Sequence, residues 1–145
     1  MAFRFPLAAV LRVWESIERR EERALQRIQL EMARVSRQVD ELSAEMAKAQ
    51  TARELALRQQ MPAGHLQDML RQAEAAAERK TALLNTLRTL EQQRDKQLKL
   101  YQTAHRDHET ILSMLQQQRT VYEQEQVRTQ QKYLDDIFMA RRHRS

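Results

Sequence analysis

Apolar residues recur in alternating steps of three and four along two long stretches of the chain, which is the pattern of helices that pack along one seam. In the first stretch the seam runs from Leu7 to Ala56, and every seam position from Leu25 to Ala49 is apolar. A repeat of this kind sustained over three or more heptads predicts a left-handed coiled coil. The first stretch therefore predicts a helix over about residues 7–60.

The second stretch keeps the same repeat less regularly. Counted in the same steps, its seam includes Leu70, Ala73, Ala77, Lys80, Leu84, Leu87, Glu91, Arg94, Leu98, Tyr101, His105, His108, Leu112, Leu115 and Tyr122. Polar residues interrupt the apolar positions, but the phase is retained. The pattern predicts a second helix over about residues 65–140.

One short interruption separates the two stretches. It holds the chain's one glycine, Gly64, beside Pro62, one of its two prolines. Proline has no N–H to donate inside a helix, and glycine has a high entropic cost of remaining helical. We therefore predict a turn over residues 61–64, with Gly64 as the N-cap of the second helix and Gln67 at its third position.

Two long helices joined by one turn predict an all-α fold, a long antiparallel two-helix coiled-coil hairpin. We expect residues 1–145 to form a single domain, with an overhanging C-terminal helix and a basic tail over 141–145. The two seams match each other when the chain folds back, which favours pairing within one chain over a parallel homodimer. The protein is expected to be a monomer when free.

The hairpin register follows from a turn centred near residues 62–63. It places Ala49 opposite Ala76 and Ala77, where small side chains allow close helix approach. It also sets two glutamates against two histidines, in a set made up of Glu18, Glu21, His105 and His108. These four residues are read as a polar layer in the seam rather than a metal site, because two histidines without a complete ligand shell are a weak metal signal.

Composition narrows the functional classes. Charged residues make up 31% of the chain, and 25 basic and 20 acidic side chains are mixed along it. Mixed charge is typical of solvated helix faces, whereas a nucleic-acid surface would gather its basic groups, so no nucleic-acid partner is expected. With no cysteine, no phosphate-binding glycine loop and no metalloprotease motif, the sequence predicts neither an enzyme nor a cofactor. No stretch is long and apolar enough for a signal peptide or a membrane span.

Two end segments carry more apolar groups than the seam requires. Near the N-terminus these are Phe3, Phe5, Leu7, Val10 and Leu11, and near the C-terminus they are Tyr133, Leu134, Ile137, Phe138 and Met139. The first group either folds back over the helix ends or contacts a partner. The second lies on the arm without an intramolecular partner and is either a protein contact or a frayed tail.

The same end segments resemble the flagellar export protein FliJ family over nearly the whole chain. The resemblance is carried by Phe3, Phe5, Leu7, Val10, Leu11 and Glu15 at one end, by Lys132, Leu134, Asp135, Asp136, Arg141 and Arg142 at the other, and by the single glycine between the helices. It implies a non-enzymatic, stalk-like coiled coil of the flagellar type III protein export apparatus, and so a part in flagellum biogenesis and motility.

The resemblance also implies partners. A FliJ-like chain would bind the hexameric flagellar export ATPase and promote its assembly and activity, and would contact the export gate protein and export chaperones. It would be cytoplasmic and reach the inner-membrane export apparatus only through these partners. Carried over by position, the ATPase-binding residues would be Phe3, Phe5, Leu7, Leu11, Tyr133, Leu134, Asp135, Asp136, Ile137, Phe138, Arg141 and Arg142. Leu66, Met69 and Leu70 near the turn would contact a second partner.

Two other interpretations remain open at the level of sequence. One is a stalk component of a virulence-type type III secretion system, which has the same mechanism in another machine. The other is a generic coiled-coil scaffold with no link to an ATPase.

Overall fold

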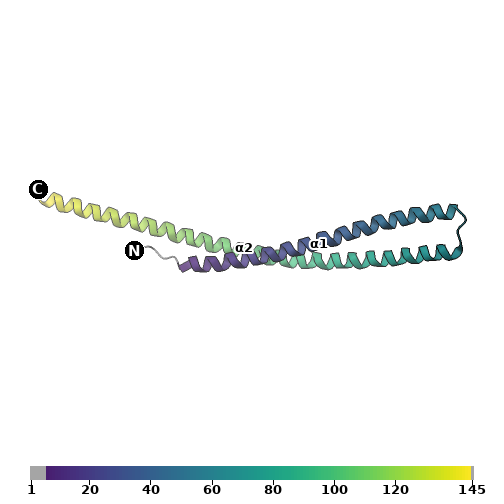
Figure 1. Cartoon of the computed structure of the whole chain (residues 1–145). Helices are drawn as coiled ribbons and strands as arrows, with labels where there is room; N and C mark the ends of the chain where they lie inside the picture. The colour runs from purple at the N-terminus through teal and green to yellow at the C-terminus, as the bar shows by residue number, and fades with distance from the viewer. Residues whose placement is uncertain (1–5, 145) are drawn as a thin grey trace. The chain divides into compact units, whose positions relative to one another are not determined.

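The computed structural model describes residues 6–144, which form two α-helices and no β-strand (Figure 1). Helix α1 spans Pro6–Arg58 and helix α2 spans Ala63–Arg144. The helices run antiparallel and pack against each other, so the predicted all-α helical hairpin is confirmed.

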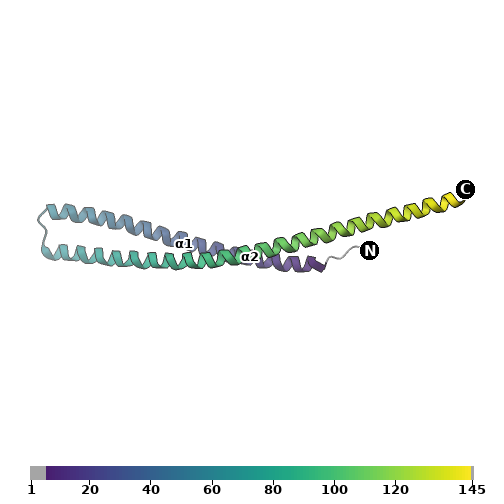
Figure 2. The same ribbon diagram turned by 180° about the vertical axis from the view of Figure 1, so that it is seen from behind.

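The contacts divide this hairpin into two units. The turn unit comprises residues 22–100 and contains the connection between the helices. The terminal unit pairs the described residues 6–21 with residues 101–144. Each unit is a pair of antiparallel helical segments with its own seam (Figure 2).

The turn lies slightly earlier than the sequence suggested. Helix α1 ends at Arg58 and α2 begins at Ala63, with the Pro62 carbonyl accepting hydrogen bonds from the backbone N–H groups of His65 (3.1 Å) and Leu66 (3.3 Å). Pro62 is therefore the N-cap, and the expected N-cap role of Gly64 is wrong. Gly64 lies in the first turn of α2 and has no positive φ, so it adopts an ordinary helical conformation.

The predicted seam of α1 is confirmed along most of the turn unit. Leu25, Val35 and Leu42 are buried, with exposed fractions of 8%, 2% and 8%. The intervening seam residues Ile28, Met32, Val39 and Met46 are half-buried. Only Ala49 departs from the pattern, since it is exposed.

The seam of α2 differs from the prediction at every second position from Leu70 to His105. The inward-facing residues are Leu66, Met69, Ala73, Ala76, Lys80, Leu83, Leu87, Leu90, Arg94, Gln97, Tyr101, Ala104, His108, Ile111 and Leu115, and the predicted Leu112 and Tyr122 are half-buried as well. Leu84 and Leu98, which were expected inside, are 42% and 37% exposed. Adjacent leucines such as Leu83 and Leu84 fit either phase of the repeat, and packing against α1 selects the phase that buries Leu90 and Ala104 in place of Glu91 and His105.

In the terminal unit, α2 continues past the start of α1. Ala104 and Leu115 are buried, and Leu7, Leu11 and Trp14 of α1 are half-buried. From residue 123 to residue 144, every position except Ile137 is exposed. We call this segment, residues 123–144, the C-terminal arm.

Candidate interaction surfaces

A carboxylate on α1 lies between two histidines of α2 within the terminal unit. Glu18 Oε1 is 2.8 Å from His105 Nδ1, and Glu18 Oε2 is 2.6 Å from His108 Nδ1. On the far side of the His108 ring, Nε2 is 3.6 Å from Glu15 Oε1. We call Glu15, Glu18, His105 and His108 the histidine–glutamate cluster.

The cluster is half-buried, and one of its rings is imperfectly bonded. The side chains of Glu18 and His108 are only 15% and 18% exposed. Both ring nitrogens of His108 are shielded from solvent and have no hydrogen bond of good alignment, although each lies near a carboxylate oxygen of Glu18 or Glu15.

The cluster differs from the predicted polar layer in one member. Glu21 pairs with its neighbour Arg20 at 3.2 Å, and Glu15, which was not part of the predicted layer, contacts His108. Glu15 and Glu21 are each three residues from Glu18 on the same helix, so the i,i+3 spacing alone does not decide between them. His105, expected in the seam, lies at its exposed edge with its side chain 50% exposed.

The environment of His105 favours its charged form. The hydrogen bond that the His105 ring donates to Glu18 raises the pKa of His105 above its ordinary value, partial desolvation opposes the shift, and the negative charges of Glu18 and Glu109 reinforce it. The ring also stacks on Tyr101, with centroids 6.1 Å apart. Within residues 6–144, no group of three or more histidine, aspartate or glutamate side chains is arranged to hold a metal ion.

The C-terminal arm presents large apolar side chains on a formed helix. The exposed fractions of Tyr133, Leu134, Phe138 and Met139 are 66%, 63%, 68% and 57%. Asp135 and Asp136 lie exposed among them, Ile137 is half-buried, and the basic residues Arg141, Arg142 and Arg144 occupy the last turn. The arm therefore combines apolar anchors with a positively charged end.

The N-terminal residues that were predicted to bind the ATPase do not belong to the C-terminal arm. Leu7 and Leu11 are half-buried at the start of α1, in the seam of the terminal unit. Phe3 and Phe5 lie outside the described residues. Of the predicted ATPase-binding set, the arm residues are thus the most accessible described members.

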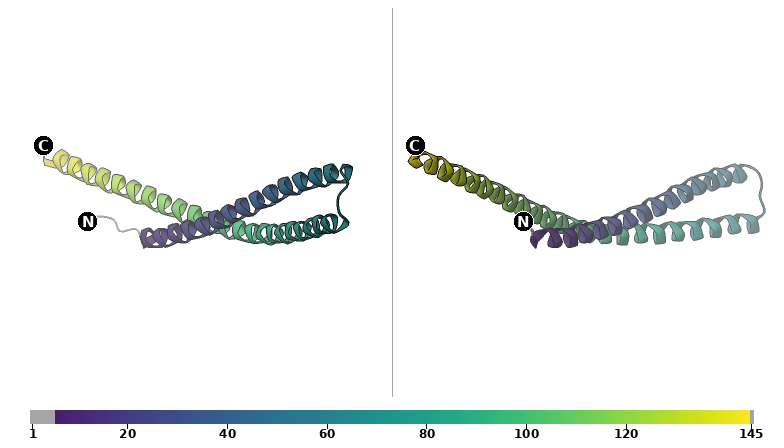
Figure 3. Two further views of the ribbon diagram at one scale, coloured as in Figure 1. Left: turned by 45° about the vertical axis from the view of Figure 1, so that its right-hand side comes forward. Right: turned by 60° about the vertical axis from the view of Figure 1, so that its left-hand side comes forward.

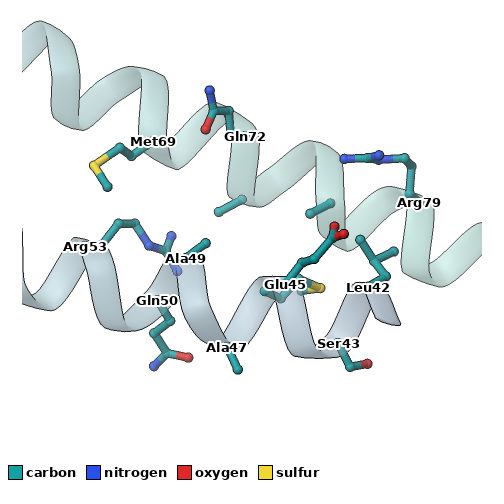
Figure 4. Close-up of a pocket in the computed structure, with 13 residues that line it drawn as sticks. Leu42, Ser43, Glu45, Ala47, Ala49, Gln50, Arg53, Met69, Gln72 and Arg79 are labelled. Carbon is teal, nitrogen blue, oxygen red and sulfur yellow. The ribbon is translucent and has the colours of Figure 1, made fainter. Parts of the chain in front are cut away.

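A groove lies between the helices of the turn unit, close to the turn (Figure 4). Its volume is about 430 Å³, and its apolar wall is formed by Leu42, Met46, Ala49, Met69, Ala73 and Ala76. Met69 points from α2 toward α1, and the side chain of Arg53 extends between the helices. The close approach expected between Ala49 and the alanines of α2 is wrong: Ala49, Ala73 and Ala76 line the groove. The two helices lie apart near the turn (Figure 3).

A family comparison adds the remaining observation. The family model described as flagellar FliJ protein matches residues 3–145. The chain belongs to the FliJ family. Comparisons with curated proteins and with solved structures give no significant match.

As a member of the FliJ family, the chain is a component of flagellar protein export. No helix among the described residues is long and apolar enough to cross a membrane.

The predicted second-partner residues of this FliJ-family chain are near the groove but unequally placed. Met69 lines it, Leu66 is half-buried, and Leu70 faces outward with 48% of its surface exposed. Sequence reasoning missed Met46 and Arg53 as groove residues. The alanines on both facing seams were the sequence signal for this groove. A layer of small side chains between two long helices either lets the helices close tightly or leaves a cavity between them.

Proposed function

We propose that this FliJ-family chain binds the hexameric flagellar export ATPase through its C-terminal arm and promotes the assembly and activity of the ring. What supports this is a single observation: the arm is a formed helix whose large apolar side chains have no covering partner among the described residues. A pre-formed helix avoids the entropic cost of ordering a segment on binding, which makes such an arm suited to insertion into a ring.

The chemistry of the arm suggests how it binds. Tyr133, Leu134 and Phe138 are its apolar anchors, and burial of an aromatic anchor at the centre of an interface is worth about 2 kcal/mol or more. Arg141 and Arg142 follow one turn later and would meet acidic groups at the rim of the ring. Rim charges mainly increase the association rate, and salt weakens their effect.

Contacts with the export gate protein and with export chaperones form the second part of the proposal. The turn-unit groove is the surface suited to such a partner, since it offers an apolar floor with Arg53 and Arg79 among its lining residues. Leu66, Met69 and Leu70 would contribute from α2. The protein would then reach the inner-membrane export apparatus from the cytoplasm through these partners.

The experiment that tests the arm compares stimulation of the purified export ATPase of the same organism. Leu134→Ala with Phe138→Ala should weaken binding by about 30-fold or more, because loss of the aromatic anchor alone costs about 2 kcal/mol, and about 1.4 kcal/mol corresponds to a tenfold change. The matched control is Leu30→Ala with Leu100→Ala, two leucines that are 69% and 55% exposed in the turn unit. Equal effects of both pairs, or full stimulation by a chain lacking residues 133–145, would assign ATPase binding to another surface.

Two alternatives are separated by the same assay. A stalk of a virulence-type secretion system would stimulate that machine's ATPase in preference to the flagellar one. A generic scaffold would stimulate neither. The family match favours the flagellar machine.

A further inference from the structure

We propose that the histidine–glutamate cluster is a pH-responsive latch that holds the first turns of α1 on α2 in the terminal unit and loosens as the pH rises. This inference does not depend on the proposed ATPase contact, because it concerns residues 6–21 and their partners on α2 rather than the C-terminal arm.

The geometry of the cluster carries the inference. One carboxylate, Glu18, contacts two imidazoles with its two oxygens, at 2.8 Å and 2.6 Å, and it retains only 15% of its side-chain exposure. A half-buried carboxylate is costly unless opposite charge compensates it. The compensating groups here are two histidines, which change charge near neutral pH.

Most other ion pairs along the chain involve arginine, which stays charged at every physiological pH. Glu31 pairs with Arg34, and Asp95 pairs with Arg94, each within one helix. The three ion pairs of the cluster instead connect α1 to α2 and involve histidine. These contacts between the helices therefore depend on pH, whereas the arginine pairs named above do not.

Loss of the imidazole charges leaves Glu18 half-buried against neutral rings. Other charged groups lie nearby on both helices. On α1 they are Arg12, Arg19, Arg20 and Glu21, with Glu21 held by Arg20, and on α2 they are Arg106, Asp107 and Glu109.

The direction of the effect follows from the two charge states. Below the ordinary histidine pKa, His105 is charged in every state of the chain, and the latch is fully closed while Glu18 remains ionised. As the pH rises through the higher pKa that His105 has in the closed latch, the stabilisation is lost. For each unit by which closing the latch raises the pKa of His105, the ratio of open to closed molecules increases tenfold as the pH rises through the transition.

The chain contains a built-in reporter for this motion. Trp14 is its single tryptophan, lies half-buried in α1 one turn before Glu18, and so shares a helix face with the latch. Quenching by acrylamide, a neutral solute, measures its accessibility, and fluorescence lifetimes separate that accessibility from direct quenching by charged imidazole. The quenching constant of the full chain should rise between about pH 5.5 and about pH 8.5, on either side of the ordinary histidine pKa of about 6.5.

Matched variants decide the outcome. His105→Gln with His108→Gln should remove the pH dependence of Trp14 quenching, whereas His65→Gln with His143→Gln, the chain's other two histidines, should preserve it. A flat profile in the unsubstituted chain overturns the proposal, as does a transition that persists in the first variant. If the first variant loses helicity, NMR titration of His105 in Glu18→Gln replaces it. The pKa of His105 should then fall, and an unchanged value would overturn the latch.

Discussion

Replacing one buried leucine tests whether the seam of α1 provides the stability of the turn unit. Leu25 and Leu30 lie on the same helix in the same unit, but Leu25 is 8% exposed and Leu30 is 69% exposed. The change to alanine removes the same atoms at both sites and raises helix propensity slightly at both. Any difference between the two variants therefore measures packing in the seam.

The magnitude follows from the atoms that leave the seam. Leu25→Ala removes three carbons at about 0.8 kcal/mol each, or about 2.4 kcal/mol of transfer free energy, to which a cavity penalty is added. A seam between two helices can relax sideways, so the loss should lie near the low end of the usual 2–5 kcal/mol range, at about 2–3 kcal/mol. Leu30→Ala keeps most of its surface in water throughout and should cost less than about 1 kcal/mol.

Urea unfolding followed by circular dichroism at 222 nm measures both free energies of unfolding. The midpoint should move to lower urea for Leu25→Ala with little change in slope, because the surface exposed on unfolding is nearly the same. Losses that agree within about 0.5 kcal/mol would refute the conclusion that burial at Leu25 stabilises this unit.

Three further predictions follow from the turn, the latch and the arm. Gly64→Ala should raise the free energy of unfolding by about 0.5–1 kcal/mol, because the position is helical and an added Cβ meets nothing within 4 Å, and a loss in urea unfolding would contradict this. NMR titration should give His105 a raised pKa, so its contribution to stability is complete below the ordinary value and disappears as the pH rises through the folded value; an unshifted or lowered pKa would exclude the Glu18 contact in solution. Deletion of residues 133–145 should leave the urea midpoint unchanged within error, since the described part of this segment is exposed but for half-buried Ile137, and a clear loss would mean that the arm packs on the rest of the chain.

Several elements were predictable from local rules. The apolar repeat of the first stretch identified α1 and its seam, because residues such as Leu25, Val35 and Leu42 have no equally apolar neighbour to compete for the inward position. The single Pro–Gly interruption located the turn to within a few residues. The i,i+3 spacing of His105 and His108 placed both rings near Glu18 once the helices were paired.

Other features required the two helices to be in place. The phase of α2 was ambiguous because Leu83 and Leu84 satisfy the repeat equally, and only the surface of α1 selects between them. The N-cap is Pro62 rather than the expected Gly64, because the Pro62 carbonyl accepts the first hydrogen bonds of α2. Gly64 follows it inside the first turn.

The sequence by itself therefore determined two long helices, their antiparallel order and the exposed apolar arm, since each follows from spacing along one chain. The tertiary structure decided which α2 residues face inward, that Glu15 rather than Glu21 contacts His108, and that the alanine layer remains open as a groove. These depend on distances between residues far apart in the chain, where a shift of one position along α2 rotates each side chain by about 100° and changes every contact.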